Sequence, residues 1–167
     1  MKHLYLMRHA KSSWDDPSLA DFDRPLNPRG LAAAPFIGEV LAGRGIVVDL
    51  ILSSPARRAR HTAELVRKSS GFACPLRFDE RIYEASQRTL AAVVSELFDP
   101  IESALLIGHN PGFEGLLEYL SGNSSSMPTA AVAYIVLDVE KWAKISPSSG
   151  KLEWLITPKE ELAAARG

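Results

Sequence analysis

The sequence predicts a single α/β domain built on a mostly parallel β-sheet, and three observations lead to that prediction. Short apolar runs of strand length recur along the 167 residues. Segments with helical periodicity lie between the early runs, which is the pattern of parallel strands joined by crossover helices. Histidine and arginine follow directly after three of the runs. No repeat and no long linker divides the chain, so residues 1–167 are expected to form one domain.

The expected elements follow from these patterns in chain order. The first and third runs are almost continuously apolar, as in strands buried on both faces of a sheet. The expected strands are Leu4–Met7, Val47–Leu52, Ala104–Ile107, Ala131–Leu137 and Leu152–Ile156. The expected helices are Pro28–Ala42, Pro55–Lys68, Ser86–Phe98 and Phe113–Leu120.

Three polar segments complete the expected organisation. The run Ser121–Thr129 is predicted to be a loop, and Ser146–Gly150 a hairpin-type connection between the last two strands. The segment Thr157–Glu160, with the sequence TPKE, is a capping box with proline at the first helical position. A short C-terminal helix is therefore expected after it.

Composition restricts the classes of function. The chain is 46% hydrophobic and carries 19 basic and 20 acidic residues, so nothing attracts it as a whole to nucleic acid or to an anionic membrane. No apolar run approaches the roughly 18 residues of a membrane span. Cys74 is the single cysteine, which excludes an intrachain disulfide and a multi-cysteine zinc site. Because Met1 leads straight into the first strand without a secretory pattern, a cytoplasmic location is expected.

Three strand ends carry the candidate functional residues. Arg8 and His9 follow the first strand, SSPARRARHT (Ser53–Thr62) follows the second, and GHNPG (Gly108–Gly112) follows Ala104–Ile107. Ligands of open parallel sheets bind outside the carboxyl ends of the strands. Two histidines and a group of arginines are thus expected to meet at one edge of the sheet.

The arginines of the second segment lie where a helix disfavours them. With Ser54 as the expected N-cap and Pro55 as the first helical residue, Arg57, Arg58 and Arg60 fall in or near the first turn. The helix dipole is positive there and costs each cation up to about 1 kcal/mol. A bound anion would reverse that sign, because backbone N–H groups and arginines would then cooperate. The alternative is three solvated arginines.

Helical geometry selects one arginine of the three. At about 100° per residue, the apolar positions between Ala59 and Val66 define the buried face. Arg58 lies about 80° from the centre of that face, Arg60 about 120°, and Arg57 nearly opposite. Only Arg58 is expected to reach a pocket above the sheet.

Imidazoles among guanidinium groups suit phosphoryl transfer. Arginines bind phosphate oxygens bidentately, a neutral histidine can attack phosphorus, and a second imidazole can stabilise the transferring group. Other phosphatase patterns fail, since Glu80 stands where a cysteine phosphatase would need arginine after Cys74, and DFDRP (Asp21–Pro25) breaks the aspartate-based motif. No P-loop, HExxH or GxSxG pattern occurs, and the four histidines have no metal-ligand spacing.

Three motifs together resemble the histidine phosphatase superfamily. They are LMRHAKS at the first strand end, SSPARRARHT after the second, and IGHNPG later. The chain looks most like the short bacterial phosphohistidine phosphatase branch, because of its length, DFDRPLNPRG (Asp21–Gly30) and MPTAAVAYIVLD (Met127–Asp138). The resemblance implies a phosphoglycerate mutase-like fold, which is a three-layer α/β/α sandwich around a mostly parallel sheet.

The resemblance also implies roles for particular residues. His9 would be the nucleophile that forms a covalent phosphohistidine, with His109 as the second imidazole. Arg8 and Arg58 would bind the phosphate, in agreement with the helical geometry, and Arg24 would border the site or form a structural ion pair. No cofactor and no metal is implied. The expected substrate is a phosphorylated protein, as in signal transduction, or a small phosphoester, and a monomer is compatible with the sequence.

Two departures from the family pattern leave alternatives open. The family often continues Arg-His-Gly-Glu, whereas this chain has Ala10 and Lys11. Glu84 in RIYEAS matches the general acid of larger relatives, but it could instead be an exposed carboxylate at a helix start. The main hypothesis is hydrolysis of phosphohistidine. The alternatives are a small-metabolite phosphatase or mutase that uses Glu84 as acid, and a noncatalytic phosphate- or phosphoprotein-binding module.

Overall fold

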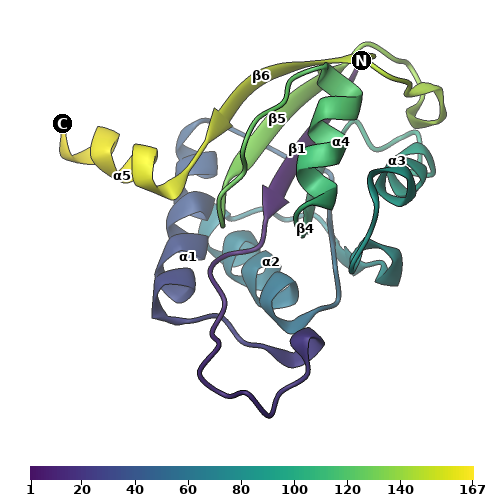
Figure 1. Cartoon of the computed structure of the whole chain (residues 1–167). Coiled ribbons are helices and arrows are strands. Elements are labelled where there is room, and N and C mark those ends of the chain that lie inside the picture. The colour runs from purple at the N-terminus through teal and green to yellow at the C-terminus, as the bar shows by residue number, and fades with distance from the viewer.

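A six-stranded sheet forms the centre of the computed structural model, which describes residues 1–167 (Figure 1). The strand order is β3-β2-β4-β1-β5-β6. The first four strands in that order pair in parallel, while β5 runs antiparallel to β1 and β6 antiparallel to β5. The predicted mostly parallel sheet is therefore confirmed. The strands are β1 (Lys2–Arg8), β2 (Leu50–Ser53), β3 (Leu76–Phe78), β4 (Ser103–Gly108), β5 (Val132–Leu137) and β6 (Gly150–Ile156).

Helices cover both faces of the sheet and complete a three-layer sandwich. The helices are α1 (Pro28–Gly43), α2 (Arg57–Ser70), α3 (Gln87–Ser95), α4 (Gly112–Ser121) and α5 (Pro158–Arg166). Single 3₁₀ turns lie at η1 (Asp21–Asp23), η2 (Glu80–Ile82) and η3 (Trp142–Lys144). Helices α1 and α2 pack together on one face, and α3 and α4 on the other (Figure 1).

The alternation of side chains along β1 explains how one strand serves two cores. Leu4 and Leu6 belong to the core under α3 and α4, whereas Tyr5 and Met7 belong to the core under α1 and α2. Successive side chains of a strand point to opposite faces, so a strand covered on both sides must be apolar throughout. The continuous apolar run at the start of the sequence has this cause.

Strands β3 and β2 both differ from the sequence-based expectation. Strand β3 was not predicted, because it has only three residues and carries Arg77 in the middle of a partly exposed edge. The second strand begins at Leu50 rather than at Val47, whose side chain is exposed. A short edge strand and an exposed valine both lack the burial on which the apolar pattern depends.

The C-terminal prediction is confirmed. The side chain of Thr157 accepts a hydrogen bond from the backbone N–H of Glu160, and Pro158 opens the helix. The resulting α5 buries none of its residues and lies beside α1 (Figure 1). None of the helices combines the length and the apolar character that a membrane crossing requires.

Candidate active site

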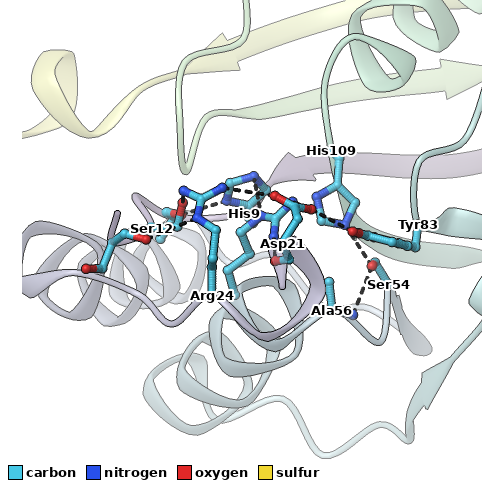
Figure 2. A network of polar contacts seen from close by, with 11 residues as sticks. His9, Ser12, Asp21, Arg24, Ser54, Ala56, Tyr83 and His109 are labelled. Carbon is cyan, nitrogen blue, oxygen red and sulfur yellow. Dashed lines mark hydrogen bonds and ion pairs between the residues drawn. The ribbon is translucent and has the colours of Figure 1, made fainter. Parts of the chain in front are cut away.

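Three adjacent parallel strands bring the two histidines together. Strand β4 lies between β1 and β2, so His109 at its end lies between His9 after β1 and Ser54 after β2. The imidazole centroids of His9 and His109 are 5.1 Å apart, and both side chains are buried. Figure 2 shows both rings within one network of polar side chains at this edge of the sheet. The predicted convergence of the strand ends is therefore present.

A backbone carbonyl fixes the orientation of His9. Its Nδ1 lies 2.7 Å from the carbonyl oxygen of Ala10, which can only accept a hydrogen bond. Nδ1 therefore carries the proton, and Nε2 presents a lone pair. Arg58 Nε lies 3.4 Å from that Nε2. Arg58 thus donates a long hydrogen bond to the Nε2 lone pair, and the guanidinium group that would hold a phosphate lies against it.

The surroundings of His9 keep its imidazole neutral. Burial lowers the pKa of His9 to about 3, with further lowering from the nearby His109, Arg58 and Arg8. The pKa of His109 falls to about 4, first through burial and then through Arg58. Both rings are therefore neutral near pH 7 when no anion is bound. A neutral Nε2 is the form that can attack phosphorus.

Ser54 orients the second imidazole. Its hydroxyl lies 2.7 Å from His109 Nε2 and accepts a hydrogen bond from the backbone N–H of Ala56 (Figure 2). The hydroxyl proton of Ser54 has no acceptor in the structure other than His109 Nε2, so Ser54 donates to Nε2 and the proton of neutral His109 lies on Nδ1. His109 Nδ1 is buried without a protein partner. It is a donor available to a bound anion.

Ser54 is not the N-cap that the sequence predicted. The helix begins at Arg57 rather than at Pro55, and its N-cap is Ala56, which makes no side-chain cap. The Ser54 hydroxyl instead bonds to Ala56 and to His109. The N-cap preference of serine assigned the Ser54 hydroxyl to the helix, but this hydroxyl also bonds to His109, which lies 55 residues away in the chain.

Replacing Ser54 with alanine tests this positioning role. We expect kcat/KM for an aryl phosphate to fall about tenfold, because a buried hydrogen bond contributes about 1 kcal/mol and holds His109 in place. The matched control is Ser53→Ala, since Ser53 is equally buried but bonds only to a backbone carbonyl. Equal losses in the two variants would contradict the role.

Arg58 lies in the pocket, and the other two arginines of α2 do not. The side chain of Arg58 is buried, while Arg57 and Arg60 are exposed, as the helical geometry predicted. Besides His9, Arg58 contacts Asp21, donating from Nη1 to its backbone oxygen and from Nη2 to its carboxylate. Thr62, one turn later, accepts from the backbone N–H of Ala10 and donates to the Arg58 carbonyl. This contact ties α2 to the backbone that follows His9.

Arg8 reaches the pocket from β1. Its Nη1 donates to the carbonyl oxygen of Met127 at 3.2 Å, while its Nε is buried without a partner. The Met127 peptide is itself fixed by Asn110 and Glu114. Arg8 Nε and His109 Nδ1 are thus two buried donors without acceptors, next to a cationic Arg58. Such a set of donors fits a tetrahedral oxyanion.

Asp21 and Tyr83 belong to the site, and sequence reasoning missed both roles. The Tyr83 hydroxyl donates to the Asp21 carboxylate at 2.6 Å, and the Tyr83 ring packs edge-on against His109 (Figure 2). Burial alone would raise the pKa of Asp21, but hydrogen bonds from Tyr83, Arg58 and Arg24 lower it to about 2. The only available signal was the DFDRP segment itself, in which Asp21 stands three residues before Arg24.

Arg24 forms structural contacts in this structure. Its guanidinium donates to Ser12, to the Ser13 carbonyl and to Asp21, and it stacks on the Trp14 ring at 3.2 Å from the centroid. These contacts fix the chain between β1 and α1. Of the two roles foreseen for Arg24, the structural ion pair is the one that the geometry displays (Figure 2).

Glu84 lies at the rim of the site. Its side chain is exposed, its backbone has φ of 51°, and it forms no hydrogen bond with either imidazole. Its charge acts on the neighbouring Tyr83, whose pKa is raised by burial, by Asp21 and then by Glu84. At no point of the chain do three His, Cys, Asp or Glu side chains gather as a metal site.

The depressed imidazole pKa values predict a pH dependence of stability. An unfolded chain with ordinary histidine pKa values, about 6.5, takes up protons that the folded pocket excludes. The free energy of unfolding should therefore fall as the pH drops below about 6.5. Between about pH 7 and about pH 5 we expect wild type to lose about 1–2 kcal/mol more than His9→Gln in urea unfolding. Equal losses would contradict the neutral burial of His9.

Fold and site together define a class of protein. An α/β sandwich that brings two neutral imidazoles together with Arg8 and Arg58 at one edge of the sheet has the groups that phosphoryl chemistry requires. The family model "Histidine phosphatase superfamily (branch 1)" matches residues 4–92. The chain belongs to that superfamily, and its fold is the phosphoglycerate mutase-like one.

Comparison with individual proteins agrees with this membership. An uncharacterized protein of Mycobacterium tuberculosis is 33% identical, over 92% of this chain and 100% of the relative. A crystal structure assigned as the phosphohistidine phosphatase SixA from Agrobacterium tumefaciens is 30% identical, with a TM-score of 0.81 over 94% of this chain and 98% of that one. The protein histidine phosphatase SixA complexed with tungstate is 22% identical and shares the fold, with a TM-score of 0.83 over 95% and 99% of the two chains.

Proposed function

We propose that this protein hydrolyses phosphohistidine in proteins through a covalent phospho-His9 intermediate. Membership of the superfamily and the likeness to SixA structures support a phosphatase. The finer proposal depends on one observation, which is that the site combines a neutral imidazole at His9 with a carboxyl group, Asp21, that is ionised and cannot act as an acid. The substrate should therefore be one whose leaving group needs little protonation.

In the first step, His9 Nε2 attacks phosphorus and the bond between phosphorus and the substrate imidazole breaks. A phosphoimidazole that carries a proton on its other ring nitrogen departs as a neutral imidazole, so no acid is required. The proton of His9 stays on Nδ1, and its hydrogen bond to the Ala10 carbonyl oxygen stabilises the positive charge that develops on the attacking ring. Arg8, Arg58 and His109 Nδ1 would bind the phosphoryl oxygens.

In the second step, water attacks phospho-His9 and the bond between phosphorus and Nε2 breaks. His9 leaves as a neutral imidazole, for the same reason as the substrate, and the two protons of the water remain on dihydrogen phosphate. The enzyme returns to its starting state. The nitrogen that gives up the phosphoryl group and the His9 nitrogen that receives it are both imidazole nitrogens. The energy of the phospho-His9 intermediate therefore lies close to that of the substrate.

The acidic groups of the pocket do not serve an alkoxide leaving group well. Asp21 has a pKa of about 2 and is ionised, and the raised pKa of Tyr83 makes its hydroxyl a weak acid. Glu84 is the remaining candidate, and it lies exposed at the rim. A small-metabolite phosphatase or mutase would depend on that carboxylate.

Comparing leaving groups tests the proposal. We expect kcat/KM for a phosphohistidine peptide to exceed that for an alkyl phosphate by about 100-fold or more, since one missing acid contributes 10²–10⁴-fold. We also expect Glu84→Gln to leave the phosphohistidine activity within about threefold. Comparable activity on alkyl phosphates, lost in Glu84→Gln, would favour the metabolite phosphatase. Phosphate binding without any turnover would favour the binding module.

A further inference from the structure

A cavity lies outside the site of the two histidines. It has a volume of about 870 Å³ and lies between the first turns of α1 and α5 and the end of the loop before β5. None of Arg8, His9, Arg58 and His109 lines it. We name it the α1–α5 groove, and the six lining residues that matter here are Lys11, Arg29, Phe36, Leu155, Lys159 and Leu162.

The groove has an apolar floor that the chain itself does not cover. Phe36 and Leu155 are half-buried, and the side chain of Leu162 on α5 is 41% exposed. Helix α5 buries no residue at all, although Leu162 gives it an apolar side. Apolar side chains of this kind are available to a partner that brings its own apolar groups.

The rim of the groove is basic although the chain as a whole is not. Lys11, Arg29 and Lys159 are exposed and form no ion pair, and only Glu160 opposes them among the lining residues. Arg29 and Lys159 occupy the first turns of α1 and α5, where the helix dipole disfavours cations. Acidic side chains of a partner would relieve both the repulsion and the dipole cost.

Two segments that carry residues of the histidine site also line the groove. Lys11 follows His9 by two residues, and its backbone packs so closely on α1 that a Cβ at Gly30 would lie 2.2 Å from the Lys11 carbonyl oxygen. On the other side, Ser126 and Pro128 line the groove, and Met127 between them accepts the hydrogen bond from Arg8. A phosphorylated residue in the pocket would therefore have neighbouring residues of its own chain at the groove.

From these observations we infer that the α1–α5 groove binds an acidic, partly apolar segment of the phosphoprotein substrate, next to the phosphorylated histidine. This inference rests on the proposed function. A free phosphometabolite fills the histidine pocket alone, so the groove distinguishes protein substrates from small ones. It would favour phosphohistidines flanked by glutamate and leucine over those flanked by lysine and leucine.

Two peptides of equal length, each with one central histidine, test the inference. One carries Glu and Leu on both sides of the histidine, and the other carries Lys and Leu. We expect wild type to hydrolyse the phosphorylated Glu peptide with kcat/KM about tenfold higher than the Lys peptide, because several rim ion pairs each contribute a few tenths to 1 kcal/mol. The double variant Arg29→Glu/Lys159→Glu should lose this preference. Its turnover of an aryl phosphate should stay within about twofold of wild type.

The matched control is Lys141→Glu/Lys144→Glu, which reverses two exposed, unpaired lysines at η3 on the other face of the sheet. It should keep the wild-type preference. A preference unchanged in Arg29→Glu/Lys159→Glu would overturn the inference, and so would an equal loss in the control. If wild type formed a dimer and Arg29→Glu/Lys159→Glu were a monomer, the groove would bind a second copy of the chain, and the inference would also be overturned.

A binding measurement separates this inference from the proposed function. The unphosphorylated peptides, followed by fluorescence anisotropy, should bind wild type with the same order of preference and lose it in Arg29→Glu/Lys159→Glu. If wild type bound the Glu peptide in this way but hydrolysed no phosphohistidine, the proposed activity would be wrong, whereas the binding of acidic segments at the groove would be confirmed. If it hydrolysed both phosphopeptides equally and bound neither, the groove would be wrong and the activity right.

Discussion

Replacing His9 with alanine is expected to lower the turnover of every phosphorylated substrate by about 10³-fold or more. The reason is that Nε2 of His9 presents a lone pair to the site, because the ring proton lies on Nδ1 and is donated to the Ala10 carbonyl oxygen. Steady-state hydrolysis of an aryl phosphate measures the loss. Wild type should also form a phosphoryl-enzyme that is stable in base and lost in acid, as a phosphoimidazole is.

Two further measurements make this expectation specific. Free imidazole should restore part of the activity of His9→Ala, because the variant opens space at the position of the missing ring. His61→Ala is the matched control, since His61 lies on α2 outside the site and its side chain forms no hydrogen bond. A phosphoryl-enzyme that still forms in His9→Ala would show that another residue is the nucleophile.

Replacing Arg58 with alanine is expected to lower kcat/KM for an aryl phosphate about 10- to 100-fold or more. Charged hydrogen bonds contribute about 1.5–3 kcal/mol, and Arg58 is the buried cation in contact with His9 Nε2. Vanadate, as a tetrahedral anion, should bind more weakly by a similar factor. Because Tyr83 and Arg24 still bond to Asp21 in the variant, the loss of stability should be smaller than the loss of activity.

Arg57→Ala is the natural comparison for Arg58. Arg57 is the neighbouring residue of the same helix and has the same charge, but it is exposed and makes one 3.4 Å contact with the Asp23 carbonyl. We expect its activity to stay within about twofold of wild type. A larger effect from Arg57 than from Arg58 would contradict the assignment of Arg58 to the phosphate.

Most of the fold could be predicted because burial leaves a regular trace in the sequence. Strand β1 is apolar at every position between Leu4 and Met7 since both of its faces are covered. For the same reason, the helical geometry of α2 distinguished the buried Arg58 from the exposed Arg57 and Arg60. Strand β3 left no trace, because a three-residue edge strand with an arginine at its centre buries almost nothing.

The site was predictable only where a local pattern carried it. His9 and His109 directly follow strands, and Arg58 lies in the first turn of a helix. Their positions in the sequence therefore indicated that they belong to the site. Asp21 and the role of Ser54 could not be found in this way, because their partners, Tyr83 and His109, lie 62 and 55 residues away. Long-range hydrogen bonds between side chains have no period and no motif of their own.

The placement of the two imidazoles on neighbouring strands has a consequence for redesign. Neighbouring parallel strands such as β1 and β4 lie about 4.8 Å apart. This spacing is close to the 5.1 Å between the ring centroids, so the backbone hydrogen bonds of the sheet set the distance between the two imidazoles. The segments after β1 and before β5 supply surroundings but not this spacing. Exchanging the loop 122–126, of which Ser126 lines the α1–α5 groove, should therefore change the surroundings of the site while leaving the reacting atoms where they are.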